Sequence, residues 1–154
     1  MVKPINMYKD PVQQSILRWK AMPCALHSDE LDKLVQDLQD TALAHPNCVG
    51  LSSNQIWDNP VTPPPAVFVV KGETGVWVVI NPVVDKQWKK EIKDNEGCMS
   101  FPGIVKKVIR PRHISVTYVD PAGTTHTGVD LFDMPARVFM HEYDHLQGIL
   151  IEDK

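Results

Sequence analysis

The sequence predicts an α+β protein of mainly antiparallel strands packed around a C-terminal helix. Three observations lead to this prediction: short β-branched runs separated by turn residues, few helical segments, and a well-marked helix near the end of the chain. Strands that follow one another in sequence before a closing helix are typical of the α+β class. The 154 residues suit one buried core, so we expect a single domain over residues 1–154.

The first long helix is expected directly after Ser28, whose hydroxyl can cap its start. Apolar residues then recur at helical spacing and stop before Pro46. These apolar positions are Leu31, Leu34, Val35, Leu38 and Ala42. They predict an amphipathic helix that packs one face against the core.

Two hairpins are expected in the middle of the chain. Residues 66–70 and 76–80 are β-branched runs separated by a glycine-containing turn. Residues 114–118 alternate between apolar and hydroxyl side chains, and the turn at residues 120–123 leads into residues 124–129. Each pair predicts two adjacent antiparallel strands.

The last helix has signals at both ends. Asp133 is a natural N-cap, Pro135 falls in the first turn, and Gly148 suits a left-handed residue beyond the end. We therefore predict a helix from about Met134 to Gln147.

Composition excludes several classes of partner. An apolar content of 43%, a net charge of −3 and a pI near 6 give no basic footprint for nucleic acid or for membranes. No apolar run has the length of a membrane span, and residues 1–6 resemble neither a signal nor a transit peptide. Three scattered cysteines fit a reducing compartment better than a disulfide framework. A cytoplasmic location is expected.

The segment His141-Glu142-Tyr143-Asp144-His145 is an H-E-x-x-H motif within the closing helix. Residues four apart on a helix lie one above the other, so both imidazoles can reach one cation. Glu142 can then lean over the open side of the metal and accept a proton from water. On spacing alone, the alternative is two ordinary histidines beside a solvated glutamate.

A third ligand must come from upstream, because only Glu152 and Asp153 follow the helix as further candidates. The upstream candidates are His27, His45, Cys98, His113 and His126. Cys98 stands out because Gly97 precedes it and Pro102-Gly103 turns the chain shortly after it. Cys24 and Cys48 are interpreted as small buried apolar residues, which is also the alternative for Cys98.

A third segment, residues 49–55, follows the first long helix. Gly50 marks a tight backbone position, and the Gln55 amide can donate a hydrogen bond to a developing oxyanion. Taken alone, this pattern is equally typical of an ordinary loop.

Together the three segments resemble the signature motifs of peptide deformylases, in the same order. The second motif, Glu-Gly-Cys-φ-Ser, is matched with Met99 at the hydrophobic position, and the third, His-Glu-φ-Asp-His-Leu-x-Gly, is matched from His141 to Gly148. The first, Gly-φ-Gly-φ-Ala-Ala-x-Gln, is matched in part: Cys48 replaces its first Gly, and Ser52 and Ser53 replace its two Ala. Segments near the start and in the central strands are also similar.

The resemblance implies a catalytic domain that removes the formyl group from formyl-methionine of newly synthesised polypeptides. It implies three metal ligands, which are Cys98, His141 and His145, with water in the fourth position. Glu142 would take the proton of the water and then protonate the leaving amine. Gln55 and the backbone N–H of Met99 would hold the oxyanion. Family members use ferrous iron, which zinc, nickel or cobalt often replaces in preparations, and the ligand types do not decide among these metals.

A pocket for methionine is expected beside the metal. Met134 and Val138 share a stripe with His141 and His145 at spacings of four, three and four, so they are predicted to form an apolar wall. The alternative is that both belong to the ordinary core. The remaining substrate-binding predictions follow from the motifs: Val49, Gly50, Glu96 and Gly97.

The expected partners are formyl-methionine nascent peptides at the ribosome, and the expected state is a monomer. One alternative keeps the metal site but changes the substrate to another N-acyl group or a peptide bond. Another is a non-catalytic metal-binding protein, against which the presence of Glu142 and Gln55 argues, since a purely structural site needs neither.

Overall fold

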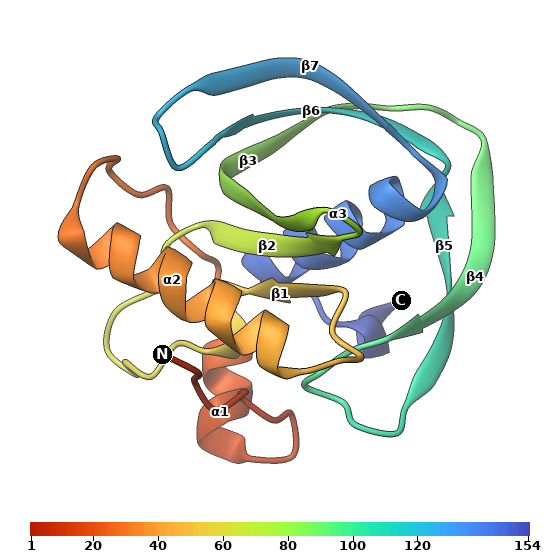
Figure 1. Ribbon diagram of the computed structural model, residues 1–154. Helices are drawn as coiled ribbons and strands as arrows, with labels where there is room; N and C mark the ends of the chain where they lie inside the picture. Colours follow the sequence, from red (N-terminus) through yellow and green to blue (C-terminus); the bar gives the residue numbers. More distant parts are fainter.

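The computed structural model describes residues 1–154. A five-stranded antiparallel sheet is ordered β1-β2-β3-β6-β7, and a separate antiparallel pair is formed by β4 and β5 (Figure 1). The strands are β1 (Gly50–Ser52), β2 (Val67–Gly72), β3 (Gly75–Gln87), β4 (Glu91–Gly97), β5 (Val105–Pro111), β6 (His113–Val119) and β7 (Thr125–Phe132). The helices are α1 (Pro11–Leu17), α2 (Asp29–Ala44) and α3 (Asp133–Leu146), with short 3-10 turns η1 (Ser53–Gln55) and η2 (Ile151–Asp153). The predicted α+β class is confirmed.

The five-stranded sheet lies between two helices. Figure 1 shows α2 in front of β1 and β2 and α3 behind them. Because neighbouring residues of a strand point to opposite faces, β2 serves both layers. Val67 and Val69 belong to the hydrophobic cluster with α2, whereas Phe68 packs edge-on against Phe139 of α3 at a centroid distance of 5.0 Å.

The predicted amphipathic helix is confirmed as α2. The Ser28 hydroxyl accepts a hydrogen bond from the backbone N–H of Leu31 at 3.1 Å, which caps the first turn. All the apolar positions named for this helix are buried in the cluster with the sheet.

Both predicted hairpins are present, as β2–β3 and β6–β7. The strand β3 is longer than predicted, because it continues into a second half that pairs with β6. Irregularities in register separate the two halves. Neither α1 nor the β4–β5 pair was predicted as a distinct element. Helix α1 has seven residues, too few for a helical period to show, and Asp10 caps it through the N–H groups of Val12 and Gln13.

Helix α3 starts and ends within one residue of the prediction. Gly148 adopts the expected left-handed conformation with φ of 75°, and a Cβ there would lie 2.3 Å from the carbonyl oxygen of Arg18. The predicted N-cap is wrong: Phe132 takes that position with no side-chain cap. Asp133 has φ of 53°, and its carboxylate instead accepts a hydrogen bond from Nε of Arg112 at 2.8 Å.

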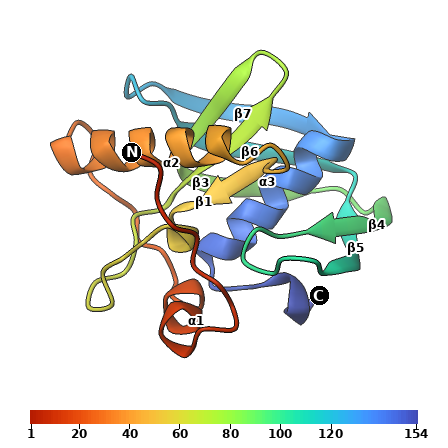
Figure 2. The same cartoon turned by 60° about the horizontal axis from the view of Figure 1, so that its bottom comes forward.

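The β4–β5 pair lies beside α3, and the C-terminal turn η2 lies below it (Figure 2). A third hydrophobic cluster supports this region and contacts Cys98, which directly follows β4. Its buried members are Leu17, Phe101, Leu150 and Ile151. No helix of the protein has the length and apolar character needed to cross a bilayer.

Candidate metal centre and active site

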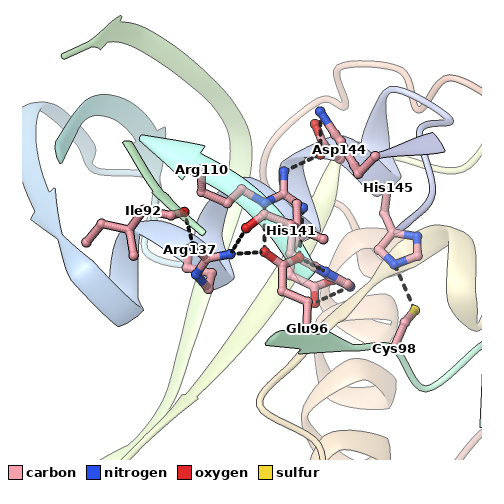
Figure 3. Close-up of polar contacts among 11 residues, drawn as sticks. Ile92, Glu96, Cys98, Arg110, Arg137, His141, Asp144 and His145 are labelled. Carbon is pink, nitrogen blue, oxygen red and sulfur yellow. Dashed lines mark hydrogen bonds and ion pairs between the residues drawn. The ribbon is translucent and has the colours of Figure 1, made fainter. Parts of the chain in front are cut away.

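The side chains of Cys98, His141 and His145 converge at the end of β4. Their sulfur and nitrogen ligand atoms all lie within 4.8 Å of one another, and Sγ of Cys98 is 3.3 Å from Nε2 of His145 (Figure 3). As expected from their spacing of four residues, both histidines lie on the buried side of α3.

The other histidine candidates lie elsewhere. His45 bonds to a backbone carbonyl of α2, His113 to Asp130, and His126 to Asp120. His27 lies against the turn at Gly123. Of the upstream candidates, the fold brings only Cys98 to the histidine pair.

A buried carboxylate orients the first imidazole. Nδ1 of His141 donates a hydrogen bond to Oε1 of Glu96 at 2.9 Å, so Nε2 is the ring nitrogen that remains for a cation. Glu96 also accepts two hydrogen bonds from Arg110, each 2.9 Å long, and one from Arg137 at 2.6 Å. Arg110 reaches Asp144, next to His145 on α3, with its remaining nitrogen (Figure 3). We call Glu96, Arg110, Arg137 and Asp144 the buried ion network.

The charges of the network set the protonation of the site. Burial raises the pKa of Glu96, but hydrogen bonds from Arg110 and His141 outweigh it and hold this pKa well below its usual range. Burial lowers the pKa of His141, but the neighbouring Cys98, the hydrogen bond to Glu96 and the Glu142 carboxylate raise it to about 10. The site therefore favours positive charge beside the thiol. Burial holds the pKa of His145 well below its ordinary value, which favours the neutral imidazole that binds metals.

The carboxylate of Glu142 lies over the same centre. Oε1 is 4.0 Å from Nε2 of His141, and Oε2 is buried without a hydrogen-bond partner in the protein. Burial raises the pKa of this carboxyl group to about 7. An acceptor oriented in this way can bind a water molecule or a substrate group near the ligand atoms.

The two residues predicted to donate to an oxyanion, Gln55 and Met99, line the same cleft as Glu142. Nε2 of Gln55 is 3.6 Å from Sγ of Cys98 and 3.2 Å from Oγ of Ser100. Its Oε1 accepts hydrogen bonds from Ser52, from the backbone N–H at 3.0 Å and from the hydroxyl at 3.3 Å. The N–H of Met99 donates to no backbone carbonyl.

All the residues predicted to bind substrate line one cleft of about 680 Å³, together with Gln55, Cys98, Met99, His141 and Glu142. The predicted substrate-binding residues are Val49, Gly50, Glu96, Gly97, Met134 and Val138. Val49 and Met134 are exposed at its rim, whereas Val138 is buried. The carboxylate oxygens of Glu96 are engaged by His141 and the two arginines.

The remaining cysteines do not join the ligand group. Cys24 is half-buried, and its backbone bonds to the side chain of Asn81. Cys48 is buried, and its thiol donates to the carbonyl of Gly50 at 3.2 Å. Burial raises the pKa of the Cys48 thiol to about 12. Both cysteines were expected to be small buried residues, and only Cys48 is fully buried.

The sequence interpretation missed Arg110, Arg137 and Asp144. One signal was available: Arg137 lies four residues before His141, so a cation falls on the stripe that the histidines occupy. Asp144 is a specified residue of the motif His-Glu-φ-Asp-His-Leu-x-Gly, but the motif does not show what its carboxylate contacts. Nothing local marks Arg110, because its partners come from β4 and α3.

Fold and site together define a class, that of α+β proteins in which an H-E-x-x-H helix and a cysteine after a strand form one candidate metal site. The family model described as polypeptide deformylase matches residues 2–154. The chain belongs to this family, whose members depend on a metal.

Relatives and solved structures agree with the family match. The chain is 34% identical over 156 residues to the peptide deformylase of Chlorobaculum tepidum, which covers all of this chain and 80% of that protein. It is 37% identical to the chloroplastic peptide deformylase 1B of Oryza sativa subsp. japonica over 98% of this chain, but it spans only 55% of that protein. The crystal structure of the Thermotoga maritima peptide deformylase superposes with a TM-score of 0.86 at 32% identity, covering 100% and 97% of the two chains.

Proposed function

We propose that this chain removes the N-terminal formyl group from formyl-methionine of newly synthesised polypeptides. The observation that carries the proposal is the convergence of Cys98, His141 and His145 in a cleft that also contains Glu142 and Gln55. Membership of the polypeptide deformylase family supports it.

The residues fit a divalent metal ion. One thiolate and two imidazoles are typical ligands of such ions, and three protein ligands leave a position open. His141 has its Nδ1 engaged by Glu96, so its Nε2 is the nitrogen that would coordinate, and the cation would displace the proton on it. When bound, the cation would polarise a water molecule and lower its pKa toward neutrality. We propose ferrous iron, with zinc, nickel or cobalt able to replace it in a preparation.

In this proposal Glu142 moves the proton. Its unpartnered Oε2 accepts the proton of the attacking water and then delivers it to the nitrogen of the leaving amine. The carboxylate is buried beside His141, where we propose that both transfers take place.

Gln55 and Met99 hold the formyl oxygen. As water attacks, this oxygen gains negative charge, and the Gln55 amide and the Met99 backbone N–H donate hydrogen bonds to it. Because a hydrogen bond to a charged oxygen is stronger than one to a neutral oxygen, these donors stabilise the developing oxyanion more than the intact formamide.

The cleft accepts the methionine side chain. Val138 with Met134 and Val49 provides an apolar wall beside the ligand group, which suits an unbranched thioether. Gly50 and Gly97 line the same cleft, where we propose that the peptide backbone lies. Since the Glu96 oxygens are engaged, we assign Glu96 to orienting His141 and not to direct contact with substrate.

We further propose that residues 1–154 form one monomeric catalytic domain that acts on nascent peptides at the ribosome in the cytoplasm. The continuous packing of both helical layers on one sheet supports a single unit. Light scattering after gel filtration tests the monomer, and sedimentation with ribosomes tests the association.

Hydrolysis of formyl-Met-Ala, acetyl-Met-Ala and unblocked Met-Ala by protein loaded anaerobically with iron or nickel tests the function. We expect rapid turnover of the formyl peptide alone. Glu142→Gln should retain the metal and lose turnover by about 10²-fold or more. Equal hydrolysis of the acetyl or unblocked peptide would assign another substrate, and no turnover with full metal occupancy would mark a non-catalytic protein.

A further inference from the structure

Ser52 makes a hydrogen bond that the alanine at this position of the family motif cannot make. It ends β1, its side chain is fully buried, and its hydroxyl donates to Oε1 of Gln55 at 3.3 Å. The backbone N–H of the same residue donates to the same oxygen at 3.0 Å. The deformylase motif has alanine at this position, so there only the backbone bond is possible.

Both bonds act on the orientation of one amide. A primary amide is planar, and rotating it by a half turn exchanges its oxygen and its nitrogen. With Oε1 held by Ser52, the NH₂ group points toward Cys98 and Ser100, where the proposed function needs a donor. In the rotated amide, an oxygen would face the developing negative charge.

The neighbouring serine provides a built-in comparison. Ser53 is equally buried and also replaces an alanine of the motif, but its hydroxyl donates to the carbonyl of Pro65 at 2.6 Å. It therefore connects η1 to the segment before β2 and does not contact Gln55. Only one of the two serine hydroxyls acts on the amide.

We propose that the Ser52 hydroxyl is a positioning group, which keeps the Gln55 amide oriented with its NH₂ toward the oxyanion. This inference rests on the proposed function, since it names a residue that acts through Gln55 on the same reaction. Two donors on one oxygen disfavour the rotated amide more than one does. A single hydrogen bond changes the ratio between the two orientations of the amide by a factor of about five.

The kinetic test compares Ser52→Ala with Ser53→Ala in formyl-Met-Ala hydrolysis. Ser52→Ala should lower kcat, by about fivefold at most, with little change in KM, because the Gln55 amide acts on the oxyanion of the transition state. Ser53→Ala should leave kcat unchanged. In a Gln55→Ala background, Ser52→Ala should have no further effect, whereas a general loosening of the loop would lower kcat in both backgrounds.

A second measurement needs no turnover. In protein labelled with ¹⁵N-glutamine, the side-chain amide signals of Gln55, assigned with Gln55→Ala, should shift or broaden in Ser52→Ala and stay fixed in Ser53→Ala. A wild-type chain that does not deformylate would contradict the proposed function alone. Unchanged amide signals in Ser52→Ala, an unchanged kcat, or an equal loss without Gln55 would overturn the positioning role.

Discussion

The backbone of Gly50 lies directly against the carboxylate of Glu142. A Cβ built on Gly50 would be 2.7 Å from Oε1 and 2.9 Å from Cγ of that side chain. The backbone of β1 therefore limits the position of the Glu142 side chain, the proposed proton carrier. No side chain fits between them.

Replacing Gly50 with alanine should displace Glu142 and lower kcat/KM for a formyl-Met peptide by about 10²-fold, since misplacement by about 1 Å has that effect. Folding should persist, as judged by circular dichroism. The matched control is Gly72→Ala, where the nearest atom to the new Cβ lies at 3.5 Å, an ordinary contact. Wild-type activity in Gly50→Ala would show that the Glu142 position is not critical.

The buried ion network should contribute strongly to stability. Arg110→Met leaves the carboxylates of Glu96 and Asp144 without their main partner, and breaking a buried pair costs about 3–5 kcal/mol. The control is Arg112→Met, which removes an exposed pair with Asp133 and should cost less than about 1 kcal/mol. Urea unfolding measures both. Equal losses for the two variants would contradict the assigned role of burial.

Cys48 should make stability depend on alkaline pH. Burial raises the pKa of its thiol from 9.0 to about 12, so the folded protein keeps a proton that the unfolded chain loses. The stabilising contribution is complete below pH 9 and is lost as the pH rises through 12, by up to about 1.4 kcal/mol per pH unit.

The comparison that isolates this group is wild type against Cys48→Ala, because all other groups titrate in both proteins. Urea unfolding at pH 8 and pH 10.5 should show a smaller alkaline loss for Cys48→Ala. Identical losses would mean that the thiol ionises normally in the fold.

Removing the metal should lower thermal stability. A cation that binds the folded chain at 100 times its Kd stabilises it by about 2.7 kcal/mol. That corresponds to a decrease in Tm of roughly 5–10 °C on treatment with a chelator. The decrease should disappear in His141→Ala and persist in His126→Ala, whose histidine pairs with Asp120 away from the site. Chelator sensitivity that survives in His141→Ala would place the metal elsewhere.

Sequence sufficed where the determinants are local. The Ser28 cap and the apolar spacing of α2, and the Gly148 end of α3, act within a few residues. The spacing of His141 and His145 is likewise a property of one helix. Such features are readable before any tertiary contact is known.

Contacts between distant segments were not readable. The carboxylate of Asp133 looked like a cap but pairs with Arg112, which tertiary structure places beside it. The arginines that hold Glu96 come from β5 and α3, and no short pattern brings those elements together. The proposed positioning role of Ser52 could not be predicted either, because it depends on the Gln55 side chain turning back toward the Ser52 hydroxyl.

The hydrophobic cluster that contacts Cys98 has a consequence for how the proposed ligand set is assembled. Leu17, Phe101, Leu150 and Ile151 join α1, the Cys98 loop and η2, so the environment of the sulfur depends on contacts between the two ends of the sequence. Contacts between residues so far apart in sequence stabilise the chain only after long loops have closed. A chain with α3 alone formed would offer a cation two imidazoles and no thiolate. The proposed ligand set is thus a property of the completed chain rather than of the H-E-x-x-H motif alone.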